Sequence, residues 1–360
     1  MCIRDRVILC LKKINKYFTE QNIALNYSLL KEPSIEYMLA VADGIERYMK
    51  DYNIEFVHGK GKRKSDIQRL YDELKEHAIK LWEYAIHMEL LGSRNSFSKT
   101  DPDATFMHMK YDYYNHTNVF KPGYNVQIGV SDGYIRNIYI SSDGNDLRTY
   151  IPFMEKYKSA YGRLPKKTPA DAGYGSYDNY SYCKENNIEL YMKYSGYYKS
   201  QEKTNEKNKF HKKHMKRTEE GNFICPAGHE FELEKVTQDS RSEYEKINMH
   251  FRCHKCKGCP MKSKCTKSKE GRTIVHNFQL EEYEKEVQKN VKSADGIQLM
   301  FQRSNETEGT FGDWKMNQKY DKMHRRGNSG VKTEIIMVAI GHNIRKYHKQ
   351  KQMVSTEESN

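Results

Sequence analysis

Two acidic residues lie in short motifs whose composition suits metal-dependent chemistry. Asp171 occurs in Ala170-Asp-Ala-Gly-Tyr-Gly-Ser176, where we expect a strand over 168–171, a glycine-containing turn and a helix capped by Ser176. The second motif, Glu308-Gly-Thr-Phe-Gly-Asp-Trp-Lys315, begins with Glu308 and ends with Lys315. Their seven-residue spacing is two helical turns, so one helix directs both side chains toward one site.

Carboxylates that converge from different elements are the ligands preferred by hard divalent ions such as Mg²⁺ or Mn²⁺. In phosphodiester cleavage, two such ions roughly 3.5–4 Å apart align the attacking oxygen and stabilise the leaving oxygen. A site of this kind needs about three acidic groups, and Asp171 and Glu308 supply two. Taken singly, an aspartate before Gly-x-Gly is as readily a turn residue, and an isolated glutamate is more often a surface residue.

A second candidate centre consists of clustered cysteines. Five of the eight cysteines fall within one polar segment, as Cys225 followed by Cys253-x2-Cys256-x2-Cys259-x5-Cys265. Such spacing is typical of a structural zinc site, because bound metal supplies folding energy that a small polar insertion lacks. An iron–sulfur cluster and free packed thiols are the alternatives, and His229 or His254 is an alternative ligand.

Composition favours a polyanionic partner. The 360 residues include 61 Lys and Arg against 48 Asp and Glu, a net charge of +13, and the 37% hydrophobic content argues against disorder. No apolar run approaches the roughly 18 residues that span a bilayer. We therefore expect a cytoplasmic, nucleoid-associated protein with no membrane partner.

The pattern of elements predicts an α/β fold. Residues 1–97 are expected to be a helical region, of which 1–6 resemble translated sequencing adapter. Strands over 124–130 and 134–140 form a predicted hairpin, followed by a helix over 146–161, the Asp171 strand, a helix over 177–185 and a strand over 188–194. This order resembles most of a ribonuclease-H-like core.

The second half of the chain is expected to interrupt and then complete that core. Residues 98–194 are its first part, 195–275 a basic, cysteine-rich, zinc-binding insertion, and 276–347 its C-terminal helical part, followed by a polar tail over 348–360. The basic run Lys199 to Arg217 either follows a DNA backbone or is a solvated surface.

Several segments, taken together and in order, resemble the DDE transposases of bacterial insertion sequences, in the branch with a cysteine-bearing insertion before the last glutamate. The matching segments are Ser98-Lys-Thr-Asp-Pro-Asp-Ala104, Pro122-Gly-Tyr-Asn-Val-Gln127, Ala170 to Ser176, Cys225-Pro-Ala-Gly228, Cys256-Lys-Gly-Cys-Pro260, Arg303 to Lys315, Arg326-Gly327 and His342-Asn-Ile-Arg345. The resemblance implies a ribonuclease-H-like core with a metal-dependent acidic site.

The resemblance also implies residue roles. Asp171 would be the second acidic ligand and Glu308 the third, with Glu306 as a fallback. The implied DNA contacts are Lys315, Arg303 and Arg326, and the implied zinc ligands are Cys225, Cys256, Cys259 and Cys265, which leaves Cys253 over.

The first aspartate of the family has no match in its usual context. In relatives it lies in a DGT-like motif upstream of the helical region, so we expect this chain to be an N-terminally truncated fragment that is inactive alone. Asp101 and Asp103 are the alternative positions within the chain, although Pro102 suits a turn.

The expected function is DNA transposition. The intact protein would bind its element's terminal inverted repeats as a homo-oligomer, cleave DNA with Mg²⁺ or Mn²⁺, and transfer the freed 3′ hydroxyl to target DNA. The rival hypothesis is a non-catalytic, zinc-dependent DNA-binding remnant or regulator of transposition. A non-transposing nuclease of the same core is the third.

Overall fold

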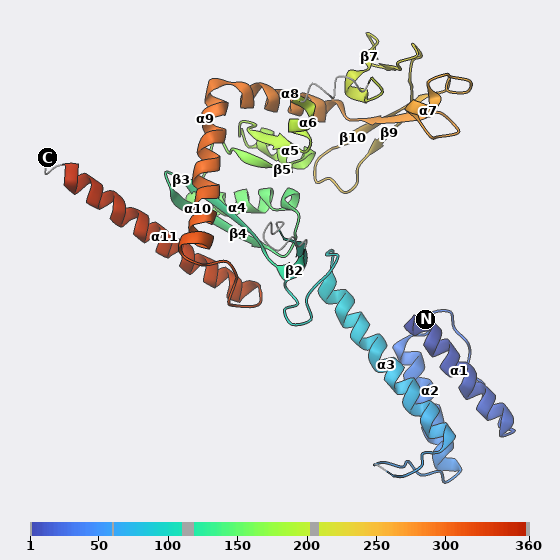
Figure 1. Cartoon of the computed structure of the whole chain (residues 1–360). Coiled ribbons are helices and arrows are strands. Elements are labelled where there is room, and N and C mark those ends of the chain that lie inside the picture. The colour runs from blue at the N-terminus through green and yellow to red at the C-terminus, as the bar shows by residue number, and fades with distance from the viewer. Residues whose placement is uncertain (1, 60, 110–118, 202–208, 358–360) are drawn as a thin grey trace. The chain divides into compact units, whose positions relative to one another are not determined.

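The computed structural model describes residues 2–59, 61–109, 119–201 and 209–357 (Figure 1). The chain divides into two compact units, Met1–Phe97 and Ser98–Asn360. Within the described ranges, no helix combines the length and the apolar character that crossing a membrane requires.

The first unit consists of three helices, α1 (Ile3–Glu20), α2 (Ile35–Asp51) and α3 (Asp66–Leu91). Ser34 and Ser65 start the last two by accepting hydrogen bonds from backbone amides of the first helical turn. The apolar faces of α1 and α2 pack on α3, burying a continuous core. The sequence predicted a helical region here, and the structure shows three helices in it.

The second unit begins with short antiparallel strands. β1 (Thr105–His108) pairs with β2 (Phe120–Gly123), and β3 (Asn125–Ser131) pairs with β4 (Tyr134–Ser141). The predicted hairpin is confirmed: Asp132 and Gly133 both have positive φ, as the two-residue turn between twisted strands requires. The last helix, α11 (Asn328–Glu357), packs its buried face against β4 and extends into the range expected to be a polar tail.

A parallel pair follows the hairpin. The 3₁₀ turn η1 (Asp146–Arg148) leads into α4 (Tyr150–Tyr161), and β5 (Ala170–Gly175) is joined through α5 (Tyr177–Glu185) to β6 (Met192–Tyr194). The bounds predicted for α5 are confirmed, whereas the strand expected over 188–194 is reduced to three residues. A tyrosine-rich core holds α4, α5 and β6 together.

Strand β5 differs from the expectation in its extent. It continues through Gly175 instead of turning after Asp171, and neither Gly173 nor Gly175 has a positive φ. The glycines allow close approach: a Cβ at Gly175 would lie 2.2 Å from the carbonyl oxygen of Lys193. Asp171 is therefore near the start of its strand, and Ser176 caps α5 as predicted.

A succession of helical segments connects the cysteine-rich region to α11. It comprises α8 (Phe278–Lys292), α9 (Ala294–Arg303), η4 (Ser304–Glu308), α10 (Gly309–Gly312) and η5 (Asp313–Asn317). In Figure 1 these segments are orange, and the chain turns sharply between α8 and the continuous run of α9 and α10. Both η4 and η5 are π-helical turns. A π turn contains more residues than an α turn. Glu308 and Lys315 are therefore less closely aligned on one helix face than the expected two α-helical turns would place them.

The cysteine-rich region has its own small sheets. β9 (Glu232–Gln238), β10 (Ile247–Cys253) and β11 (Arg272–His276) form a three-stranded antiparallel sheet, and β7 (Lys216–Arg217) pairs with β8 (Phe223–Ile224). The short helices are α6 (Tyr197–Gln201), η3 (Lys212–His214) and α7 (Lys262–Cys265). Phenylalanines 223, 231 and 251 pack with buried cysteines in its core.

The α/β class is confirmed, but the described strands do not join into one central sheet. β3–β4 and β5–β6 are separate pairs. The ribonuclease-H-like core and the status of 195–275 as an insertion therefore remain predictions.

Candidate active site and cysteine pocket

Asp171 projects from an exposed face of β5. Exposure alternates along the strand, with Asp171 and Gly173 exposed and Ala170 and Ala172 half-buried, as expected when successive side chains point to opposite faces. One carboxylate oxygen of Asp171 accepts a hydrogen bond from the amide of Ala172 at 2.7 Å. The carboxylate is thus held at the strand start and open to solvent.

A further carboxylate, Asp146, lies against the same strand. Its Oδ1 accepts hydrogen bonds from Asn125 Nδ2 at 2.7 Å and Gln127 Nε2 at 3.1 Å, both from β3. Its Oδ2 lies 2.9 Å from the position that a Cβ at Gly173 would occupy. Sequence reasoning missed this residue, because an Asn-Asp pair ahead of a helix has an ordinary local role: Asn145 caps η1.

Glu308 lies at the end of η4 and is held by an arginine. Arg303 donates to Glu308 Oε1 at 3.0 Å, and η4 packs against β3. Glu308 is exposed, whereas the fallback Glu306 is half-buried and its carbonyl accepts from the Thr310 hydroxyl. The exposed position favours Glu308 as the functional carboxylate.

Tyr174 links these groups. It is half-buried and packs edge-on against Tyr150, with ring centroids 6.1 Å apart. Burial raises the pKa of Tyr174, the charges of Asp146 and Asp171 raise it further, and Arg303 opposes them. All three charged groups are therefore near enough to influence the Tyr174 hydroxyl, and Arg303 in turn pairs with Glu308. The ring packs against the tyrosine-rich core.

The basic residues assigned to DNA contact occupy exposed positions. Lys315 lies on η5 and Arg326 just before α11, and among the described residues no acidic partner is found for either. Arg303 differs from these two residues, because it forms an ion pair with Glu308.

Asp101 and Asp103 have structural partners. Asp101 accepts from the hydroxyl of Tyr124 at 2.8 Å and from the amide of Gly327 at 3.2 Å, and Asp103 accepts from the amide of Asn328 at 2.7 Å. Two motifs more than 200 residues apart thus meet where α11 begins. The negative charges suit that helix N-terminus, so these aspartates have a sufficient role in holding it.

The matching motif His342-Asn-Ile-Arg345 also makes contacts that stabilise the fold. Asn343 bonds the backbone of Ile135 twice, each at 2.9 Å, and His342 Nε2 lies 3.0 Å from the Gly133 carbonyl oxygen. Arg345 pairs with Asp313 of η5. The motif His342 to Arg345 therefore fastens α11 to the hairpin and to the helix that carries Lys315.

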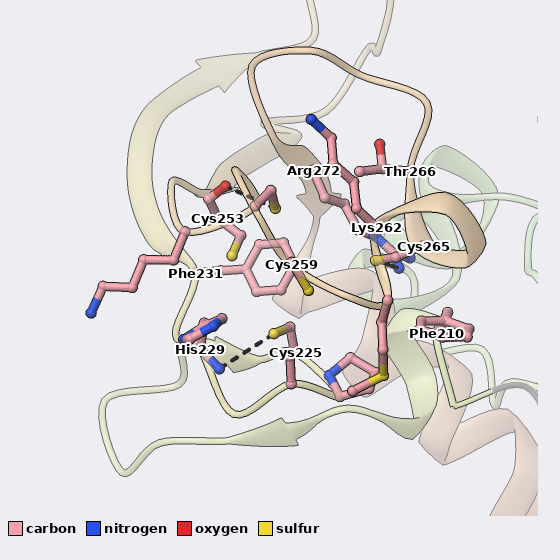
Figure 2. Close-up of a pocket in the computed structure, with 15 residues that line it drawn as sticks. Phe210, Cys225, His229, Phe231, Cys253, Cys259, Lys262, Cys265, Thr266 and Arg272 are labelled. Carbon is pink, nitrogen blue, oxygen red and sulfur yellow. Dashed lines mark hydrogen bonds between the residues drawn. The ribbon is translucent and has the colours of Figure 1, made fainter.

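The clustered cysteines share one pocket. Figure 2 shows side chains from separate segments of the chain surrounding one pocket. All five cysteines line it, together with His229, Phe231 and Arg272. Cys253 and Cys256 are buried, and burial raises the pKa of Cys253 to about 12, with the neighbouring thiols Cys256 and Cys225 contributing.

The types of side chain in the pocket suit zinc, but their sulfur atoms are not placed as zinc ligands in this structure. The amide of His229 donates to Cys225 Sγ at 3.3 Å and Arg272 donates to Cys265 Sγ at 3.1 Å, contacts that stabilise thiolates. Cys256 Sγ instead faces the Cys253 carbonyl oxygen at 3.3 Å. Across the described part of the chain, no three His, Cys, Asp or Glu side chains are grouped closely enough to hold a metal ion. Binding would require thiol rotamers to change.

The basic run beside the pocket is partly used in ion pairs. Lys213 contacts Glu284 at 2.8 Å and Arg217 contacts Glu281 at 2.7 Å, both on α8. These side chains attach the cysteine-rich region to α8. Residues 202–208 of the run lie outside the described residues.

Comparison with known proteins gives one match. Residues 224–348 match the family model described as a transposase DDE domain. No curated protein and no solved structure matches the chain. The matched range contains the five cysteines, Glu308 and Lys315, whereas Asp171 precedes it. The match over residues 224–348 supports the resemblance of this chain to DDE-type transposases.

Proposed function

We propose that this protein is the transposase of a bacterial insertion sequence. It binds the terminal inverted repeats of its element, cleaves a DNA strand there, and joins the freed 3′ hydroxyl to target DNA. The observation that carries the proposal is the DDE-domain match over 224–348, which includes both Glu308 and Lys315.

Asp171 and Glu308 are the proposed ligands of Mg²⁺ or Mn²⁺. Exposed carboxylates on separate elements fit hard divalent ions, and the charges of Asp171 and Arg303 that both act on Tyr174, with the Arg303–Glu308 pair, support their nearness. When bound, such ions align an attacking oxygen and stabilise the leaving oxygen. Arg303 restricts the Glu308 side chain, while Lys315 and Arg326 supply positive charge for DNA phosphates.

The first acidic group is proposed to be the aspartate of an upstream DGT-like strand, as the resemblance implies. The hydrogen bonds of Asp101 and Asp103 to the start of α11 argue against either as the substitute. On this proposal the 360-residue chain does not cleave DNA by itself, because a site lacking one carboxylate holds its second ion poorly.

The proposed zinc ligands are Cys225, Cys256, Cys259 and Cys265. Their common pocket and the donors to Cys225 and Cys265 support the assignment. Zinc would stabilise the small sheets around it, because their buried core is limited to a few aromatic and sulfur side chains.

The test compares this chain with one extended upstream through the next DGT-like motif. The substrate is end-labelled DNA carrying the repeats that flank the gene, incubated with Mg²⁺ or Mn²⁺. We expect cleavage by the extended chain alone, and loss of cleavage with retained binding in Asp171→Asn. Equal loss of binding and cleavage would show that Asp171 is structural.

The same assay separates the alternatives. Binding without cleavage by the extended chain would support a DNA-binding remnant or regulator. Cleavage without strand joining, and without preference for the flanking repeats, would support a nuclease. Cleavage by the short chain that is lost in Asp101→Asn or Asp103→Asn would relocate the first aspartate.

A further inference from the structure

Asp146 is a carboxylate to which the resemblance assigns no role. Its Oδ1 is fixed by the side-chain amides of Asn125 and Gln127, at 2.7 and 3.1 Å. The backbone also restrains it, because the carbonyl oxygen of Asp146 accepts from both the amide and the hydroxyl of Thr149. Among the described residues no donor is found for Oδ2.

The free oxygen lies over the face of β5 that Asp171 occupies. A Cβ at Gly173 would point at Asp146 Oδ2 from 2.9 Å, so the carboxylate sits directly above that glycine. Asp171 and Gly173 are alternate residues and both are exposed. Same-face positions in a strand are about 7 Å apart, which is close enough for two carboxylates to reach one cation between them.

We propose that Asp146 and Asp171 bind the same divalent cation. The inference rests on the proposed function, since it adds a ligand to that metal site. Two amides that hold Oδ1 orient the carboxylate and leave Oδ2 presented, which is how supporting hydrogen bonds prepare a metal ligand. Gly173 fits this role, because any larger residue would displace the carboxylate.

Mn²⁺ binding to the 360-residue chain tests the proposal without DNA cleavage. The protein is first loaded with zinc to occupy thiols and desalted, and free Mn²⁺ is then measured by electron paramagnetic resonance. Asp146→Asn retains an Oδ1 acceptor but replaces the anionic Oδ2, so folding is kept and Mn²⁺ affinity falls by about tenfold or more. Asp171→Asn should weaken binding similarly.

Asp143→Asn is the matched control. It removes the same charge three residues away, from a carboxylate that pairs with Arg148 at 3.3 Å. Mn²⁺ affinity should stay unchanged. A decrease equal to that of Asp146→Asn would mean that general loss of negative charge explains the effect and would overturn the proposal.

Two further measurements separate a ligand from a structural residue. Gly173→Ala displaces the Asp146 carboxylate without changing charge, so it should also weaken Mn²⁺ binding; unchanged binding would overturn the proposal. Fe²⁺ in place of Mn²⁺, with peroxide, should cut the backbone near both 146 and 171.

The two variants distinguish a wrong assignment of Asp146 from the absence of a metal site at β5. Weakened Mn²⁺ binding in Asp171→Asn with normal binding in Asp146→Asn would refute only the shared ligand. Normal binding in both variants would refute the metal site at β5 itself.

Discussion

The close approach of β5 and β6 makes Gly175→Ala a sharp test of how the Asp171 strand is held. An added Cβ would lie 2.2 Å from the Lys193 carbonyl oxygen, 2.6 Å from the Tyr194 Cα and 2.8 Å from the Tyr180 hydroxyl. The first two neighbours are backbone atoms, which cannot rotate away. The two strands would therefore have to separate.

The loss of stability in Gly175→Ala can be approximated from the packing at this position. Forcing an extra methyl into a filled site costs about 1–3 kcal/mol. Replacing a glycine within a strand recovers about 0.5–1 kcal/mol, because the unfolded chain loses freedom. Since backbone atoms form the obstacle, we expect a net loss near the upper end, about 2 kcal/mol of unfolding free energy.

Tryptophan fluorescence can report on the second unit alone. The chain has two tryptophans, of which Trp82 is in the first unit and 58% exposed, while Trp314 is in the second and 2% exposed. In a Trp82→Phe background, urea unfolding followed at Trp314 should show a midpoint lowered by about 0.7–1 M in Gly175→Ala.

The control is Gly309→Ala, because no atom lies within 4 Å of an added Cβ at this helical position. Its midpoint should stay the same or rise, since alanine favours a helix over glycine by about 1 kcal/mol. An unchanged or higher midpoint in Gly175→Ala would refute the close pairing of β5 with β6, and with it the placement of Asp171.

The remaining predictions concern the acidic and cysteine sites. In the extended protein, Glu308→Gln should abolish cleavage and retain binding to flanking-repeat DNA, whereas normal cleavage would move the role to Glu306. One zinc ion per chain should be found by metal analysis, falling in Cys259→Ser but not in Cys2→Ser; iron with visible absorbance would instead indicate a cluster. Lys315→Ala should reduce the slope of log binding constant against log salt by about 0.9, as for one lost phosphate contact, and Lys285→Ala, whose charge is paired with Glu282 at 2.8 Å, should not.

The sequence predicted correctly those elements that are determined by residues close to one another in the chain. The hairpin of β3 and β4 follows from alternating apolar residues around Ser131-Asp132-Gly133, and the turn adopts the positive φ values that these residues allow. The helix 177–185 follows from its serine cap and ends at the Asn186-Asn187 break. Both depend on neighbours within a few residues.

Tertiary contacts explain what the sequence did not predict. Gly173 and Gly175 have the composition of a turn, but they lie in a strand, where Asp146 and the β6 backbone approach too closely for a side chain. Asp146 itself has the local pattern of a helix start, so only the fold reveals its carboxylate above β5. Asp101 and Asp103 are the alternative first aspartates, and only the fold reveals that they also bond Gly327 and Asn328.

The helical segments α8, α9 and η4 connect the cysteine-rich region to Glu308 along the chain. Lys213 and Arg217 attach the cysteine-rich region to α8 through partly exposed ion pairs, each of which contributes about 1 kcal/mol or less. On its other side α8 is held more firmly, because Val287 and Val291 are buried in the tyrosine-rich core and Asn290 bonds the Leu190 carbonyl oxygen at 3.1 Å. The position of α9, and of the Arg303–Glu308 pair that follows it, therefore depends more on β6 than on the cysteines. The β5–β6 pair and the core around it, more than the cysteine-rich region, therefore hold the helices that lead to Glu308.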